Sequence, residues 1–349
     1  MLGVCLPCIR RQPQAAVEIA LRAHRQSRLE FGLPPGPPDS PGGLACNVCV
    51  NRCRMAENEM GYCGLRRNQN GRLVGPTSNA AKLSWYHDPL PTNCVASWVC
   101  PGETGAGHPQ FAYRRGAETG FKNLAVFFQA CSFNCLFCQN WHFRHETLTS
   151  PYRTVEELVA DADERTSCIC YFGGDPAPQM RFAIKAAKQA RENADGRILR
   201  ICWETNGSVN PDLLDEVLEI AVYSGGCVKF DLKTRDPSLH VALTGVTNQR
   251  TLDNFARAAQ KIGRRPVPPL LIASTLLVPG YIDAREVGAI AGFIAGLNPD
   301  IPYSLLAFHP QFFMSDLSLT SKTLADQCMR AARDAGLKNA RLGNVHLLA

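Results

Sequence analysis

The sequence predicts an α/β fold, a partial barrel of six strand–helix units with a cysteine-rich module in front of it. From 121 to 349, short runs rich in Val, Ile, Leu and Phe alternate with helical segments. Such alternation is typical of parallel strands joined by crossover helices. Residues 45–120 hold six cysteines and many glycines with little periodicity, which is typical of a small metal-stapled module.

The first 44 residues are expected to form an amphipathic helix over 14–31 and a linker, because the prolines and glycines of GLPPGPPDSPGG cannot continue a helix or a strand. Barrel strands are predicted at 123–129, 168–172, 198–204, 227–232, 270–278 and 303–308. Helices are predicted at 155–163, 178–193, 211–221, 251–263 and 284–297. Six units favour a partial barrel over a closed barrel of eight.

Composition narrows the class of protein. A chain of 349 residues is long enough for one large domain with an appended module. Its formal charge of +6 is spread along the chain, so no nucleic-acid or membrane partner is indicated. No stretch has the length and apolarity of a membrane span, and charge appears before any apolar signal region develops. A cytoplasmic protein is expected.

Cysteine is the outlying residue type, with sixteen in the chain. In a reducing compartment, clustered thiols usually bind metal or carry out redox chemistry. Cys131, Cys135 and Cys138 have C-x3-C-x2-C spacing, which lets one loop present three sulfurs to an iron–sulfur cluster or to zinc. No fourth ligand is adjacent, so a [4Fe-4S] cluster here would keep one iron open to a chelating small molecule.

Polar or glycine residues follow each predicted strand, where parallel β/α folds gather their ligands. After the triplet loop these strand-end segments are Gly173-Gly174-Asp175-Pro176, Glu204-Thr205-Asn206-Gly207, Asp231-Leu232-Lys233, Val278-Pro279-Gly280 and Phe308-His309-Pro310. One mouth of the barrel is therefore expected to collect cysteines, acids, a lysine and a histidine.

With Phe137 just before its last cysteine, the triplet resembles the signature of the radical S-adenosylmethionine (SAM) superfamily. GGDP resembles that superfamily's Gly-Gly-Glu-Pro motif, with Asp175 in place of glutamate. ETNG and KFDLK resemble the strand ends of glycyl-radical-enzyme activases, with Glu204 in place of aspartate. LLVPGYID, LLAFHPQFFMSDL and GLKNARLGNV extend a resemblance to the AmmeMemoRadiSam-type and pyruvate formate-lyase-activating-enzyme-like group from about Cys46 to the end.

The resemblance implies reductive cleavage of SAM at a [4Fe-4S] cluster on the triplet, giving a 5'-deoxyadenosyl radical that abstracts hydrogen. The implied SAM-binding residues are Phe137, Gly173, Gly174, Asp175, Pro176, Glu204, Asn206, Asp231, Lys233, Val278 and His309. None is assigned as a catalytic acid or base, because the bond chemistry belongs to the cofactor. Implied partners are a glycyl-radical enzyme, or another protein, peptide or small-molecule substrate, and an electron donor such as flavodoxin or ferredoxin.

A second cysteine set lies in the module. Cys46, Cys49, Cys53 and Cys63 can close a tetrahedral site, and they resemble the amino-terminal motif of the same group. Structural zinc and an auxiliary iron–sulfur cluster both fit this spacing. The remaining module cysteines, Cys94 and Cys100, are candidates for ligands to either site or for simple packing.

Each assignment has a simpler alternative. Cys168, Cys170, Cys202 and Cys227 fall within predicted buried strands, where cysteine usually packs as a small hydrophobe. The strand-end acids are equally typical of helix N-caps and turns, and His309 of an ordinary loop. A non-enzymatic electron carrier or zinc-stabilised interaction module is the alternative function, although such a protein does not need a ring of strand-end motifs.

Overall fold

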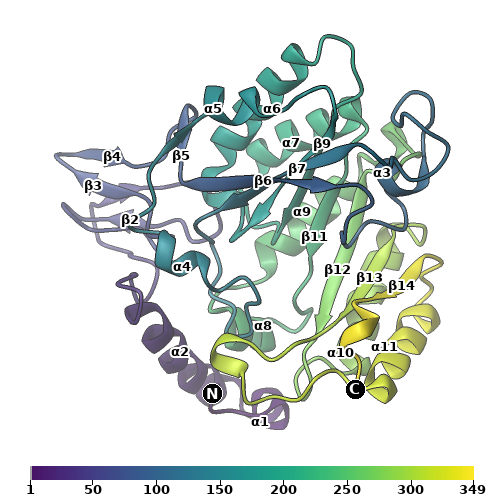
Figure 1. The fold of residues 1–349 in the computed structure, drawn as a ribbon. Helices are drawn as coiled ribbons and strands as arrows, with labels where there is room; N and C mark the ends of the chain where they lie inside the picture. Colours follow the sequence, from purple (N-terminus) through teal and green to yellow (C-terminus); the bar gives the residue numbers. More distant parts are fainter. Residues whose placement is uncertain (1) are drawn as a thin grey trace.

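The computed structural model describes residues 2–349 and has an eight-stranded curved sheet at its centre (Figure 1). In spatial order the strands are β14 (Ala340–Gly343), β13 (Tyr303–Ala307), β12 (Leu271–Leu277), β11 (Val228–Asp231), β10 (Arg200–Thr205), β9 (Thr166–Gly173), β7 (Lys122–Phe128) and β6 (Leu83–Pro89). Strand β6 is antiparallel to β7, and every other neighbouring pair is parallel. The α/β fold class and the partial barrel are thereby confirmed.

All six predicted strands are present, and the sheet contains two that were not predicted. Strand β14 is short and partly exposed, so it lacks the apolar run that marks a buried strand. Strand β6 is largely exposed and comes from the 45–120 segment, but it pairs with β7 along its whole length. Both missed strands lie at the edges of the sheet, where burial leaves the weakest sequence pattern.

The barrel helices are α5 (Val155–Ala160), α6 (Met180–Asn193), α7 (Pro211–Ser224), α8 (Pro237–Thr244), α9 (Gln249–Ala259), α10 (Ala284–Leu297) and α11 (Lys322–Asp334). Of these, α8 and α11 were not predicted. Local caps explain where several begin: Thr154 and Glu157 form a capping box at α5, and the side chains of Asn210 and Asp283 cap α7 and α10.

Two helices precede the module, α1 (Leu6–Arg11) and α2 (Pro13–Leu29), and α2 corresponds to the helix predicted over 14–31. Helix α2 packs against α8 of the barrel. Between the linker and the barrel lie short elements: β1 (Leu44–Ala45), β2 (Arg54–Met55), β3 (Arg67–Gln69), β4 (Arg72–Val74), β5 (Ala80–Ala81) and α3 (Pro101–Thr104). After β7 come α4 (Phe143–Glu146) and β8 (Arg153–Thr154), which pairs with β5.

Side chains on the barrel strands alternate between two environments, as the pleat of a strand requires. Ile169, Tyr171, Ile201 and Trp203 are fully buried in the main core beneath the helices. The intervening positions carry cysteines and charged residues, and these face the inside of the barrel. Among residues 2–349, no helix combines the length and apolarity needed to cross a membrane.

Candidate functional site

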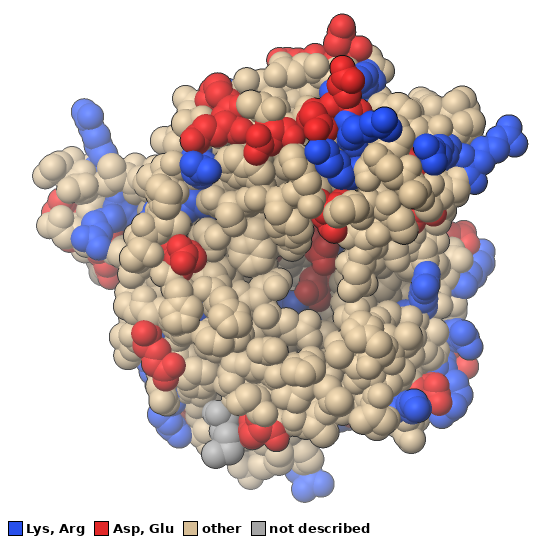
Figure 2. Space-filling model, viewed as in Figure 1, with Lys and Arg blue, Asp and Glu red and all other residues tan. Residues whose placement is uncertain are grey.

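A cavity of about 400 Å³ lies at the carboxyl ends of the barrel strands. The predicted site residues in its wall are Cys131, Cys135, Phe137, Cys138, Gly173, Gly174, Asp175, Glu204, Asn206, Asp231 and Lys233. Figure 2 shows a hollow near the centre of this view, with acidic and basic side chains inside it. The cysteine triplet and three strand ends, distant in sequence, therefore meet in one cavity.

Backbone hydrogen bonds hold the triplet loop against the end of helix α8. The N–H of Asn134 donates to the carbonyl of Thr244 at 2.9 Å, and the N–H of Leu136 donates to that of Leu243 at 3.0 Å. Burial raises the pKa of Cys135 to about 12 and that of Cys131 well above its ordinary value. Since the thiolate is the form that binds metal, a cation in the cavity is needed to hold these sulfurs deprotonated.

Asn134, inside the triplet loop, ties that loop to helix α2. Its Nδ2 donates to Ser27 Oγ at 2.8 Å and lies 3.1 Å from His24 Nδ1. Its Oδ1 accepts from the Arg144 guanidinium at 3.0 Å. All four side chains are buried. The first 45 residues lie outside the resemblance, and no motif marks them, so sequence reasoning missed that α2 positions the triplet loop.

The Gly173-Gly174 pair keeps the end of β9 against the end of β7. The N–H of Gly174 donates to the carbonyl of Phe128 at 2.9 Å, and that of Asp175 donates to Ala130 at 2.8 Å. A Cβ atom on Gly174 would lie 2.4 Å from the Ala130 carbonyl oxygen. A side chain at this position would therefore push apart the two loops that bring the triplet and the GGDP segment together.

The Asp175 carboxylate joins two strand-end loops. It accepts from the N–H of Ala177 at 2.7 Å, the N–H of Asn206 at 2.6 Å and the hydroxyl of Thr205 at 3.2 Å. Burial raises the pKa of Asp175 to about 6, although these donors oppose the shift. Both oxygens are thus occupied within the protein, so Asp175 shapes the cavity wall as a turn acid does.

Asp231 and Lys233 form a partly buried ion pair at the cavity wall. Burial alone lowers the pKa of Lys233, but the Asp231 carboxylate raises it above the ordinary value. The ammonium lies 5.6 Å from the centre of the Phe137 ring. Asp231 Oδ1 is buried and has no hydrogen-bond partner among the described residues. An unpartnered acceptor and a partly buried cation beside three thiols fit a ligand that carries both a hydroxyl or amine donor and a carboxylate, as SAM does.

Three predicted residues do not line the cavity. Pro176 directly precedes the 3-10 turn Ala177–Gln179 after β9, and Val278 is fully buried in the main core. His309 is exposed, and its Nδ1 lies 3.1 Å from the carbonyl of Pro310. The strand ends to which Val278 and His309 belong do not bring these two side chains into the cavity.

Other residues line the cavity that were not predicted as site residues. They include Asn93 and Trp98 of the loop before α3, and Arg341 and Asn344, which lie in the GLKNARLGNV segment noted for its resemblance. The indole N–H of Trp98 donates to Ser304 Oγ at 3.1 Å, which fastens the loop between β6 and α3 over the barrel. Docking of this loop depends on tertiary contacts, so only the cysteine spacing of TNCVASWVC marked it in the sequence.

The module cysteines Cys46, Cys49, Cys53 and Cys63 come together around a small cavity of about 10 Å³. Their loop contacts the barrel next to the triplet: the amide of Asn51 donates to the carbonyl of Ser132 at 2.7 Å. In residues 2–349, no three His, Cys, Asp or Glu side chains stand as close together as the ligands of a single bound ion. The thiols of each predicted set instead surround a cavity.

The sequence of this chain is similar to those of several known proteins. Residues 125–289, which contain the triplet loop and the strands β9 to β12, match the radical SAM superfamily. Over just under half of its length, this chain is therefore similar to the radical SAM superfamily. Together with relatives named as activating enzymes, this match indicates an enzyme.

One relative of this chain is the isethionate sulfite-lyase activating enzyme of Desulfovibrio desulfuricans, 32% identical over 158 residues, or 45% of this chain and 46% of the relative. The pyruvate formate-lyase 1-activating enzyme of Escherichia coli is 31% identical over 142 residues, 38% and 53% of the two chains. An uncharacterized protein of Methanocaldococcus jannaschii is 26% identical over 311 residues, 86% and 81%. The match spans about half the length of each activating enzyme.

Proposed function

We propose that this chain binds a [4Fe-4S] cluster through Cys131, Cys135 and Cys138 and cleaves SAM reductively. When bound, the cluster and SAM supply one-electron cleavage of a carbon–sulfur bond, which gives a 5'-deoxyadenosyl radical for hydrogen abstraction. The observation that carries the proposal is the single cavity that holds three thiols of one loop beside the strand-end acids and lysine. Cys94 also reaches this cavity, but its sulfur is engaged by Lys229 Nζ at 3.2 Å.

The chain's own residues are proposed to position SAM and to exclude water. Lys233 offers a partly buried cation to a carboxylate, and Asp231 Oδ1 offers a free acceptor to a hydroxyl or an amine. The side-chain amide of Asn206 lies 3.7 Å from Cys131 Sγ and 2.9 Å from Ser132 Oγ. Hydrogen bonds of this kind orient a thiolate ligand and tune its cluster.

The test is formation of 5'-deoxyadenosine after anaerobic reconstitution and chemical reduction. The variant with Cys131, Cys135 and Cys138 all replaced by Ala is expected to lose this activity completely. A matched control replaces Cys5 and Cys8, an exposed pair outside both cysteine-lined cavities, and keeps wild-type activity. Undiminished 5'-deoxyadenosine from the triple variant would refute the assignment.

We propose further that the hydrogen is taken from a glycine of a partner enzyme, with flavodoxin or ferredoxin as electron donor. The support is that two relatives are named as activating enzymes of isethionate sulfite-lyase and pyruvate formate-lyase. Deuterium carried on the glycines of a candidate partner should then appear in 5'-deoxyadenosine. If label appears instead from a peptide or small molecule, that class replaces the glycyl-radical partner.

We also propose a cytoplasmic location, because reductive cleavage of SAM at an iron–sulfur cluster favours a reducing compartment.

For the module, we propose that Cys46, Cys49, Cys53 and Cys63 hold a single structural metal ion, which would draw the four thiols closer together than they stand around the cavity. Their cavity of about 10 Å³ is close to the space of one water molecule, roughly 10–15 Å³ by the same measure, and four thiolates suit zinc. Metal analysis should find one zinc per chain, which is lost when Cys49 is replaced by Ser. Iron and sulfide at this set in place of zinc would contradict the proposal.

A further inference from the structure

A second cavity, of about 110 Å³, lies inside the barrel and is lined by six cysteines. They are Cys94, Cys100, Cys168, Cys170, Cys202 and Cys227. Two come from the loop between β6 and α3, two from β9, one from β10 and one from the residue before β11. None belongs to the triplet or to the module set, so the proposed function leaves all six without a role.

The strand register points these thiols at one another. Cys168 and Cys170 occupy alternate positions on β9, and Ile169 between them faces the main core. Cys202 of β10 is the direct register partner of Cys170. The Sγ atoms of Cys202 and Cys227 are 3.9 Å apart. Cysteine side chains from neighbouring parallel strands thus lie next to one another on the inner face of the barrel.

A buried lysine lies among the sulfurs. Lys229 Nζ lies 3.2 Å from both Cys94 Sγ and Cys170 Sγ, and its side chain is 2% exposed. Its acidic partner is Glu204 at 3.2 Å, with a side chain that is 32% exposed. Neutral thiols are weak acceptors, and a charge kept in a barrel interior needs strong compensation. Packing of six small hydrophobes gives no reason for an ammonium group here.

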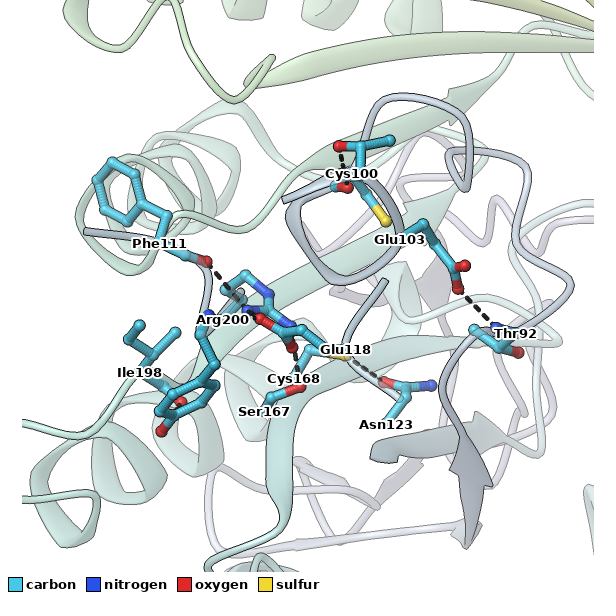
Figure 3. A network of polar contacts seen from close by, with 12 residues as sticks. Thr92, Cys100, Glu103, Phe111, Glu118, Asn123, Ser167, Cys168, Ile198 and Arg200 are labelled. Carbon is cyan, nitrogen blue, oxygen red and sulfur yellow. Dashed lines mark hydrogen bonds and ion pairs between the residues drawn. The ribbon is translucent and has the colours of Figure 1, made fainter. Parts of the chain in front are cut away.

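The other buried cation nearby, Arg200, is already neutralised. It forms a two-pronged ion pair with Glu118, at 2.6 and 2.9 Å. Figure 3 shows Cys100 and Cys168 around this pair, with Cys168 Sγ donating to Asn123 Oδ1. Lys229, whose acidic partner Glu204 is partly exposed, is therefore the cation on this wall whose charge nearby thiolates would help to balance.

We propose that this cavity binds an iron–sulfur cluster through thiolate ligands drawn from the six cysteines, with Lys229 donating N–H···S hydrogen bonds to two of them. All-thiolate donors without histidine suit iron–sulfur clusters. The ligands of a cluster surround a body of iron and sulfide, so they form a ring around a cavity, as these six do. The volume of about 110 Å³ is several times what one ion or one water fills.

The proposed cluster adjoins the SAM cavity. Asn93, Cys94, Phe172 and Glu204 line both cavities, and Glu204 bridges them through its ion pair with Lys229. The cluster would therefore lie next to the strand ends that the SAM proposal uses, separated from them by this shared wall.

The test is the iron and acid-labile sulfide content of the full chain after anaerobic reconstitution. Replacing Cys170 and Cys202 together by Ala is expected to remove one cluster's iron and sulfide, whereas 5'-deoxyadenosine formation persists because neither residue lines the SAM cavity. The Cys5→Ala/Cys8→Ala control should keep wild-type content. Unchanged iron in the Cys170/Cys202 variant, loss of zinc in place of iron, or a metal-free Cys202–Cys227 disulfide in the wild type would each overturn the proposal.

A second variant tests the proposal independently, in case the Cys170/Cys202 variant does not fold. Lys229→Met keeps every thiol and replaces the ammonium with an apolar chain of similar length. It should retain full iron content, and the midpoint potential of one cluster should become more negative, because a positive charge and two hydrogen bonds to sulfur are lost. A redox titration in which every cluster keeps its wild-type potential would contradict the inference.

Discussion

The imidazole of His24 lies 3.1 Å from Asn134 Nδ2 through its Nδ1 atom and 3.0 Å from the Ala242 carbonyl through its Nε2 atom. A neutral ring satisfies both contacts, with Nε2–H donating to the carbonyl and Nδ1 accepting from the amide. Protonation of Nδ1 would remove the acceptor that Asn134 uses. Burial lowers the pKa of His24 to about 4, which keeps the ring neutral.

We therefore predict that acid weakens the anchor of the triplet loop. Below about pH 6.5 the unfolded chain binds a proton at His24 that the folded chain does not, so the free energy of unfolding falls as pH decreases toward 4. The limit is about 1.4 kcal/mol per pH unit for one histidine. Urea unfolding between pH 5 and 7.5 should show a shallower slope in His24→Gln. His240, whose pKa burial also lowers to about 4, keeps part of the slope in the variant. Equal slopes would contradict this prediction.

Gly174→Ala should damage both stability and SAM cleavage. The added Cβ would stand 2.4 Å from the Ala130 carbonyl oxygen, so the ends of β7 and β9 must separate. We expect a loss of about 1–3 kcal/mol, as for overpacking of a tight core, and a large drop in 5'-deoxyadenosine formation. Gly292→Ala is the matched control, since its site on α10 is exposed and has nothing within 4 Å. That variant should be neutral or more stable by about 0.5–1 kcal/mol.

The sequence predicted the barrel well because alternation of apolar runs and helices is a long-range, repeated signal. It also predicted most of the cavity wall, since the carboxyl ends of parallel strands must converge. It could not predict His24 or Trp98, whose places depend on how α2 and the β6–α3 loop dock. For the interior cysteines the sequence predicted packing as small hydrophobes, and Cys202 and Cys227 do pack in a small apolar cluster with Ala96 and Ile272. The sequence did not show that their period-2 spacing places them on the inner face of the barrel beside Lys229.

Glu118→Gln should be strongly destabilising. Glu118 and Arg200 are 0% and 2% exposed, and the variant would leave a buried guanidinium without its counter-charge. Breaking a buried pair in this way costs about 3–5 kcal/mol. Asp215→Asn, which breaks the more exposed Arg257–Asp215 pair, should cost at most about 1 kcal/mol. Chemical denaturation of both variants checks the contrast, and similar losses would count against it.

Asn51→Ala should loosen the triplet loop from the module. The Asn51 amide donates to the carbonyl of Ser132, the residue after Cys131, so its removal leaves a buried acceptor unpaired. The cost of such a loss is about 1–3 kcal/mol. Because that cost falls on the loop proposed to hold the cluster, iron should leave the reconstituted variant faster than the wild type when a chelator is added. Asn193→Ala, on the exposed end of α6, is the control and should release iron at the wild-type rate. Should Asn51→Ala also release iron at that rate, the module would have no part in holding the loop.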